Sequence, residues 1–282
     1  MYTNVFMITD GYLCFDTLGF LKEMEPSLSR AIIWNSGGAS SLIIFLKCLG
    51  FTWEQMELKL NDLKCLPNII YGGSLEPGVG QDTKREIVSW MVDIINSKKV
   101  FSQDTTMKEI YKLTKIFPNF ITSEGCINPK THPDVALLDG ILASMCNFGV
   151  YDNHKIEDKE FSSFTLHNPY PLDSEVKLEN VSLKTLYISN YSKLYNNEIF
   201  SLFDRVENIL IQQYFDRVYK IISDNHNEDH VLINGIFDRT DITNYEIKQR
   251  VDNGKNHALM FKNGESTLKY MDEIINKIKN QS

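Results

Sequence analysis

Hydrophobic and polar positions in the first fifty residues alternate between two spacings. Short unbroken apolar runs at residues 4–9 and 31–34 are typical of buried strands. Each run is followed by turn-forming residues and then by apolar positions at helical spacing, in residues 16–25 and 42–49. Asp16 is the expected N-cap of the first helix. Two strand–helix units in succession predict parallel strands with crossover helices, and any site at the carboxyl edge of the sheet.

The same spacings continue along the rest of the chain. They predict helices over 52–65, 82–97, 107–113, 133–146, 197–223 and 265–279, and strands over 114–122, 183–189 and 231–234. Thr52 and Gln55 have the spacing of a capping box. The glycine-rich stretch 71–80 lacks the residues of a phosphate-binding loop and is interpreted as a connection. We expect an α/β domain over residues 1–195 and a helix-strand-helix extension, 196–282, packed on it.

Charge excludes one class of partner. The 282 residues hold 29 Lys and Arg against 37 Asp and Glu, a net charge of −8. Binding to nucleic acid needs clustered Lys and Arg, whereas here the lysines alternate with acids along the expected helices. We therefore expect no nucleic-acid partner.

Cysteine usage and hydropathy bear on compartment and cofactors. The five cysteines form no Cys-x-x-Cys pair, which favours a reducing compartment over a zinc site, and no acidic loop has calcium-site spacing. We expect no metal or other cofactor. No run of eighteen apolar residues and no signal-peptide pattern is present, which predicts a cytoplasmic protein without a transmembrane segment. The abundance of Asn, Ile, Lys and Asp is common in AT-rich genomes, including those of large DNA viruses.

The stretch Asn35-Ser36-Gly37-Gly38 joins the second expected strand to its helix. A serine at such a junction lies near free backbone N–H groups, which stabilise negative charge, so Ser36 is the candidate nucleophile. The usual motif is Gly-x-Ser-x-Gly. Here Gly38 supplies the second glycine and Trp34 replaces the first. The alternative is that Ser36 is an ordinary N-cap.

The order of these pieces resembles the patatin-like phospholipase family over about residues 3–173. The matching segments are the first strand running into 19–23, the elbow 35–39, the helix that begins near 52–54, the segment 106–114, the helix 139–144 and the turn 167–172. The resemblance implies a three-layer α/β/α fold with a mostly parallel central sheet and a helical C-terminal extension. It also implies a serine acyl hydrolase with a Ser-Asp dyad. The C-terminal region resembles that of patatin-like proteins from large DNA viruses.

The chemical motifs depart from those that the resemblance implies. Of the glycine-rich oxyanion loop only Gly11 is present, so Gly11 and Gly37 are the expected donors. At the elbow, the indole of Trp34 is expected to displace the neighbouring strand or to point away. Counting back from the Asn-Pro turn at 168–169 puts Ser162 at the place of the dyad aspartate. A serine cannot act as a base near neutral pH.

Other residues remain as alternatives for the missing base. A shift of one position gives Phe161 or Ser163. The nearby acids and histidines that could replace it are Asp152, Asp158, Glu160, His154 and His167. Asp139, which precedes Gly140, falls within an expected helix and is interpreted as a decoy.

Three hypotheses about function follow. The first is an impaired or inactive lipid acyl hydrolase homologue that keeps Ser36 and contacts a lipid or a protein partner, peripheral membrane contact included. The second is an active phospholipase of the A type using Ser36 on an acyl ester. The third is a structural or virion-associated protein on this fold. Three independent departures from the motif favour the first.

Overall fold

A computed structural model describes residues 1–9, 13–63, 79–145, 153–162, 184–194, 229–237 and 244–265. In chain order the elements are β1 (Asn4–Thr9), α1 (Leu13–Glu23), α2 (Glu25–Leu28), β2 (Ile33–Gly38), α3 (Ser40–Cys48), α4 (Trp53–Asn61), α5 (Val79–Asn96), α6 (Met107–Thr114), β3 (Phe117–Thr122), β4 (Gly125–Ile127), α7 (Leu137–Met145), β5 (His154–Ile156), β6 (Lys159–Phe161), β7 (Thr185–Leu194), β8 (His230–Phe237) and α9 (Asn244–Lys262). The expected helices at 197–223 and 265–279, apart from residue 265, and the glycine-rich stretch 71–78 lie outside the described residues.

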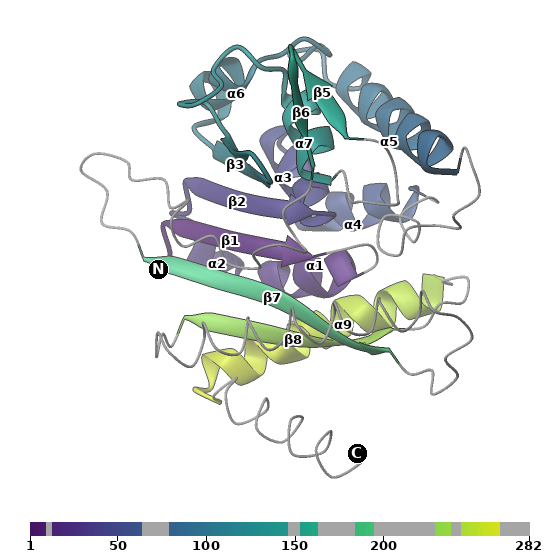
Figure 1. Ribbon diagram of the computed structural model, residues 1–282. Coiled ribbons are helices and arrows are strands. Elements are labelled where there is room, and N and C mark those ends of the chain that lie inside the picture. The colour runs from purple at the N-terminus through teal and green to yellow at the C-terminus, as the bar shows by residue number, and fades with distance from the viewer. Residues whose placement is uncertain are drawn as a thin grey trace.

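A six-stranded sheet in the order β4-β3-β2-β1-β7-β8 forms the centre of the molecule (Figure 1). All neighbouring strands are parallel except β3 and β4, which are antiparallel. The strands β5 and β6 form a separate antiparallel pair. The α/β class and the mostly parallel sheet are therefore confirmed.

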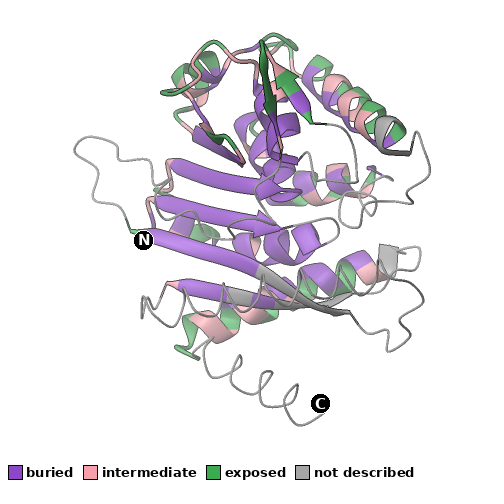
Figure 2. Ribbon diagram, viewed as in Figure 1, coloured by how far each residue is buried: buried purple, intermediate pink, exposed green. Residues whose placement is uncertain are grey.

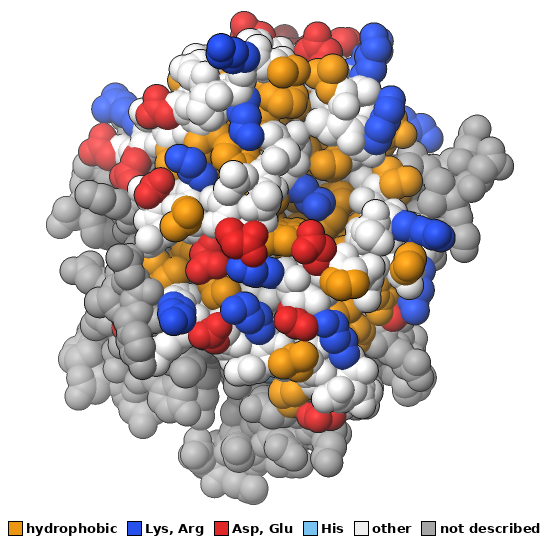
Figure 3. All heavy atoms as spheres, turned by 180° about the vertical axis from the view of Figure 1, so that it is seen from behind, with side chains coloured by type: hydrophobic (Ala, Val, Ile, Leu, Met, Phe, Trp, Pro, Cys, Tyr) orange, Lys and Arg blue, Asp and Glu red, His pale blue; other side chains and the backbone are white. Residues whose placement is uncertain are grey.

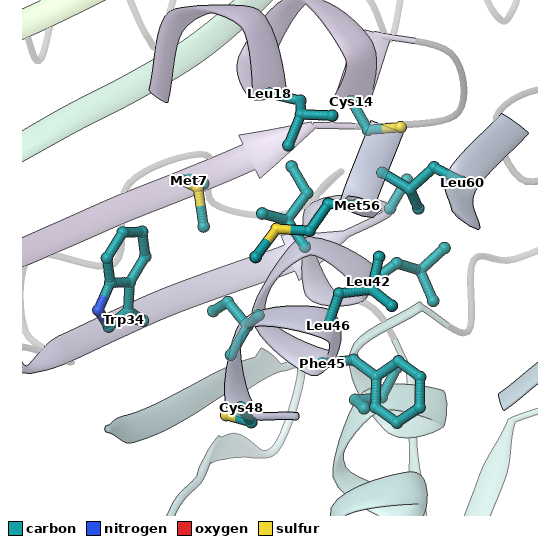
Figure 4. Packing of buried hydrophobic residues seen from close by; sticks show 14 of the residues in the cluster. Met7, Cys14, Leu18, Trp34, Leu42, Phe45, Leu46, Cys48, Met56 and Leu60 are labelled. Carbon is teal, nitrogen blue, oxygen red and sulfur yellow. The ribbon is translucent and has the colours of Figure 1, made fainter. Parts of the chain in front are cut away.

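Strands β1 and β2 of the sheet are buried along their whole length, on both faces (Figure 2). Met7 of β1 and Trp34 of β2 belong to the same core as Leu42 and Leu46 of α3 (Figure 4). Fully buried strands explain why both appear in the sequence as runs rather than alternating patterns.

A chain of amide side chains crosses the sheet from strand to strand. Asn4 Nδ2 donates to Thr185 Oγ1 at 3.0 Å, and Asn35 Nδ2 donates to Asn4 Oδ1 at 2.6 Å. Asn119 Nδ2 donates to Asn35 Oδ1 at 2.8 Å, and Asn128 Nδ2 donates to Asn119 Oδ1 at 2.9 Å. All five residues are buried. Each amide satisfies the next, which is what makes polar groups tolerable at this depth.

The described C-terminal part continues the fold. Strand β8 pairs with β7, and α9 packs on α1. At the helix crossing a Cβ on Gly19 would lie 2.0 Å from the Val251 carbonyl oxygen, and one on Gly254 would lie 1.9 Å from that of Asp16. Only glycine permits this approach of the two backbones.

Several expected boundaries change. Asp16 is not an N-cap, because α1 begins at Leu13 and buries the Asp16 carboxylate against α9. Arg250 Nη1 lies 3.2 Å from Asp16 Oδ2, and Asn253 Nδ2 donates to Asp16 Oδ1 at 2.7 Å. Pro26 lies in the first turn of α2, where its missing N–H costs nothing. In the part of the chain that the structure describes, no helix is long and apolar enough to cross a membrane.

Candidate functional site

The turn between β2 and α3 is made at Gly38. Strand β2 ends at Gly38, whose φ is +65°, and α3 begins two residues later at Ser40. This left-handed conformation is the one for which glycine is the default residue. Ser36 was expected in the turn, but it lies two residues earlier, inside β2, opposite Met7 and Phe120. Ser36 does not have a positive φ, so it lacks the left-handed conformation found at Gly38.

The hydroxyl of Ser36 is held in a chain of three serines. Ser36 Oγ lies 3.0 Å from Ser41 Oγ, which lies 2.7 Å from Ser144 Oγ. Ser144 Oγ donates its proton to the Ile141 carbonyl oxygen at 2.8 Å. The proton of Ser41 is then directed to Ser144, and that of Ser36 to Ser41. The partner of Ser36 is therefore another hydroxyl and not a base.

Ser40 fixes the start of α3 against the sheet. Its Oγ donates to the carbonyl oxygens of Gly37, at 2.7 Å, and Met7, at 3.0 Å. Ser36, Ser40 and Ser41 all have no exposed surface. The small side chains let the strand and helix pass closely, and each hydroxyl finds a partner in the crossing.

Trp34 does not disturb the turn. It lies inside β2, opposite Val5 and Pro118, and its Nε1 donates to the Ala31 carbonyl oxygen at 3.1 Å. Lys47 Nζ lies 4.5 Å from the centroid of the Trp34 ring, and burial lowers the pKa of this lysine. The expected displacement of the neighbouring strand does not occur, because position 34 is four residues from the crowded turn.

Asn35 and Gly37, on either side of Ser36 in β2, have structural roles. Asn35 belongs to the amide chain across the sheet and also donates to the Val5 carbonyl oxygen at 2.9 Å. Gly37 lies opposite Ile8 within β2. Gly11, the other expected oxyanion donor, lies outside the described residues.

Ser162, the residue expected at the dyad position, contacts Ser123 after the end of β3 and not Ser36. Ser162 Oγ donates to Ser123 Oγ at 2.8 Å, and Ser123 N donates to the Ser162 carbonyl oxygen at 2.8 Å. Asp158 and Glu160 are exposed on the β5–β6 hairpin. Asp152, Ser163 and His167 lie outside the described residues, and none of the described candidates contacts Ser36.

The structure brings together a histidine and an acid that the sequence did not pair. His154 Nε2 lies 2.9 Å from Asp139 Oδ1, so Asp139 orients an imidazole rather than a serine. His154 Nδ1 is buried without a hydrogen-bond partner. Ser41 and Ser144, the two other members of the serine chain, were also missed. No spacing in the sequence relates residue 41 to residue 144, because the contact forms only when α7 packs against α3.

A pocket elsewhere on the surface lies between α1, α4 and α9. It has a volume of about 340 Å³ and is lined by Lys22, Glu57, Leu58, Asn61, Ile247, Lys248, Val251, Asp252 and Lys255. None of these residues belongs to the β2–α3 turn. The side of the molecule in Figure 3 mixes acidic and basic side chains, with hydrophobic groups in small clusters between them.

Comparisons with known proteins support the fold. No family model matches the sequence, and no curated protein is similar enough in sequence to count as a relative. Among solved structures, VipD from Legionella pneumophila superposes with a TM-score of 0.56 at 10% identity, over 94% of this chain and 67% of VipD. The fold is patatin-like. The patatin-like α/β/α arrangement is thus shared despite the low sequence identity.

The type III effector ExoU is a second, more distant structural neighbour. Its TM-score is 0.48 at 10% identity, and the match covers 94% of this chain and 53% of ExoU. The structure of full-length ExoU from Pseudomonas aeruginosa in complex with SpcU gives 0.43 at 9% identity. This chain therefore spans about half the length of ExoU.

Proposed function

We propose that this chain is a patatin-like lipid acyl hydrolase homologue with impaired or absent catalysis, which contacts a lipid or acyl ester without turning it over. The observation that carries the proposal is the state of Ser36. Its hydroxyl has no exposed surface and is directed to Ser41, and among the described residues no carboxylate or imidazole contacts it. An unactivated serine is a weak nucleophile.

Ser162, the residue expected at the place of the dyad aspartate, supports the same function. Ser162 replaces a base with a hydroxyl and is bonded to Ser123. Ser36 is thus buried and Ser162 is bonded elsewhere, and catalytic groups that act as a unit lose most of their effect when one is lost. A cytoplasmic protein with at most peripheral membrane contact fits this function, and its viral origin stays a prediction.

Serine-reactive labelling tests the proposal. Purified full-length protein is incubated with a fluorescent fluorophosphonate and, separately, with phospholipid vesicles whose released fatty acid is measured. We expect neither labelling nor release above the level of Ser36→Ala. Stoichiometric labelling that Ser36→Ala abolishes would overturn the proposal and establish the active phospholipase instead.

A further inference from the structure

The turn between β2 and α3 has the geometry of a nucleophile elbow centred on a residue other than Ser36. In such an elbow the serine stands at the sharp turn from strand to helix, with a small residue two positions before it and another two positions after it. The turn here is at Gly38, the left-handed residue. Two positions before and after it are Ser36 and Ser40.

We propose that Gly38 occupies the nucleophile position, so that Ser36-Gly37-Gly38-Ala39-Ser40 is the Gly-x-Ser-x-Gly pentad with its serine and glycines exchanged. This inference rests on the proposed function and deepens it. Catalysis is lost because the position that would attack an acyl carbonyl has no side chain. Ser36 is then the small residue of the crossing and not a displaced nucleophile.

The contacts of the two flanking serines support this assignment. Ser36 bonds to Ser41, and Ser40 bonds to the Gly37 and Met7 carbonyl oxygens. Both side chains are fully buried in the crossing where the motif needs small residues. Their hydroxyls hold the strand and helix together.

Thr9 provides an independent observation. It ends β1 directly opposite Gly38, and neighbouring strands lie roughly 4.8 Å apart. Thr9 is 2% exposed, and its Oγ1 has no hydrogen-bond partner. Buried hydroxyls are rarely left without a partner. The hydroxyl without a partner therefore belongs to the residue that pairs with Gly38 across the sheet.

The test restores a hydroxyl at the turn and asks whether it reacts. In Gly38→Ser, the serine Oγ would attack the phosphorus of a fluorophosphonate, an O–P bond would form, fluoride would leave, and the serine proton would pass to solvent. Gly38→Ala is the matched control, since it carries the same left-handed strain without the hydroxyl. The labelled residue is identified by mass spectrometry of peptides, and circular dichroism checks the fold of each variant.

We expect Gly38→Ser to be labelled at position 38 and Gly38→Ala to stay unlabelled, because the N–H groups at the start of α3 stabilise the developing charge on a hydroxyl at this position. The labelling persists when Ser36→Ala is added. A folded Gly38→Ser that stays unlabelled overturns the assignment of Gly38 and leaves impaired catalysis standing. Wild-type protein labelled at Ser36 overturns both proposals.

A second variant keeps the test decisive if Gly38→Ser does not fold. The triple variant Ser36→Gly, Gly38→Ser, Ser40→Gly creates the full Gly-x-Ser-x-Gly motif, with glycine at both positions where the strand and the helix cross. Labelling of the triple variant at position 38 supports the assignment. A folded triple variant without labelling contradicts it.

Discussion

At the scale of single residues, Asn119 stands at the centre of the amide chain that crosses the sheet. Its side chain donates to Asn35 and accepts from Asn128, and it has no exposed surface. Asn119→Ala leaves an acceptor and a donor buried without partners. We expect the free energy of unfolding to fall by roughly 2–6 kcal/mol, from about 1–3 kcal/mol for each of the two orphaned groups.

Urea denaturation measures this change. Asn256→Ala, on an exposed position of α9, is the control and should change the free energy of unfolding by less than about 1 kcal/mol. If Asn119→Ala were as mild as this control, the amide chain would contribute nothing to stability.

Asp16 gives a second prediction at this scale, on pH. Burial raises the pKa of its carboxyl to about 6, while Arg250, Asn253 and the backbone act in the opposite direction. Because the unfolded pKa is near 3.8, the folded state holds the proton more tightly between these values. The charged form therefore destabilises the protein above about pH 6, and this penalty disappears as the pH falls below 4.

The measurement compares wild type with Asp16→Asn. The groups that face Asp16 are Arg250 and Asn253 from α9 and Cys14 from its own helix, and Arg250 keeps its charge throughout. Between pH 4 and pH 7 the free energy of unfolding of wild type should fall relative to the variant by roughly 2–3 kcal/mol. A difference that rises with pH would show that pairing with Arg250 outweighs burial.

Helix caps could be predicted from single residues, whereas the position of a turn that depends on backbone conformation could not. Thr52 caps α4 as expected, because a capping box depends on residues three positions apart, and Thr106 caps α6 by the same arrangement with Glu109. The turn after β2 was expected at Ser36 and lies at Gly38. Two adjacent glycines allow the chain to turn at either, and the choice follows from the register of β2 with β1.

At the scale of elements, the crossing of α1 and α9 depends on two glycines that face the opposite backbone. Alanine normally favours a helix over glycine by about 1 kcal/mol. At Gly254, however, the added Cβ would lie 1.9 Å from the Asp16 carbonyl oxygen and 2.8 Å from the Phe20 nitrogen. Both are backbone atoms, so the helices must move apart. We expect Gly254→Ala to lower the free energy of unfolding by about 1–3 kcal/mol.

Chemical denaturation again measures the effect, with Asn256→Ala as a control on the same helix. The two alanines should act in opposite directions, since the exposed position gains helix propensity without a clash. Stabilisation by Gly254→Ala would mean that the two backbones are further apart than the structure shows.

The same helix shows where elements could and could not be predicted. The strands β1 and β8 and the helix α5 agree with their apolar patterns, and Ile87, Met91, Ile94 and Ile95 form a buried stripe along α5. Helix α9 was not expected. Its sequence holds Asp252, Asn253 and Gly254 in mid-helix, residues that favour turns locally. Their contacts with α1 decide the structure, and those contacts are more than two hundred residues away in sequence.

At the scale of the whole molecule, the described C-terminal segments complete the core. Val231 and Ile233 of β8 and Ile247, Val251 and Ala258 of α9 belong to the same hydrophobic cluster as β1 and α1. The ion pair between Asp16 and Arg250 is buried between the two parts. We propose that this core crosses the expected division at residue 195 and that the two parts fold as one cooperative unit.

Expressing residues 1–195 alone tests this cooperativity. The fragment lacks β8 and α9, so β7 becomes an unpaired edge strand, the α1 surface is exposed, and the Asp16 carboxylate loses Arg250. We expect a fragment that aggregates, or one that keeps helical circular dichroism, binds a hydrophobic dye and unfolds without a cooperative transition. The full chain is the control.

A fragment with a cooperative transition near that of the full chain would show that the C-terminal region is an appendage, as the division at residue 195 implies. An aggregating fragment that refolds when residues 196–282 are added in trans would support a shared core, because only a docked β8 and α9 can supply the missing contacts.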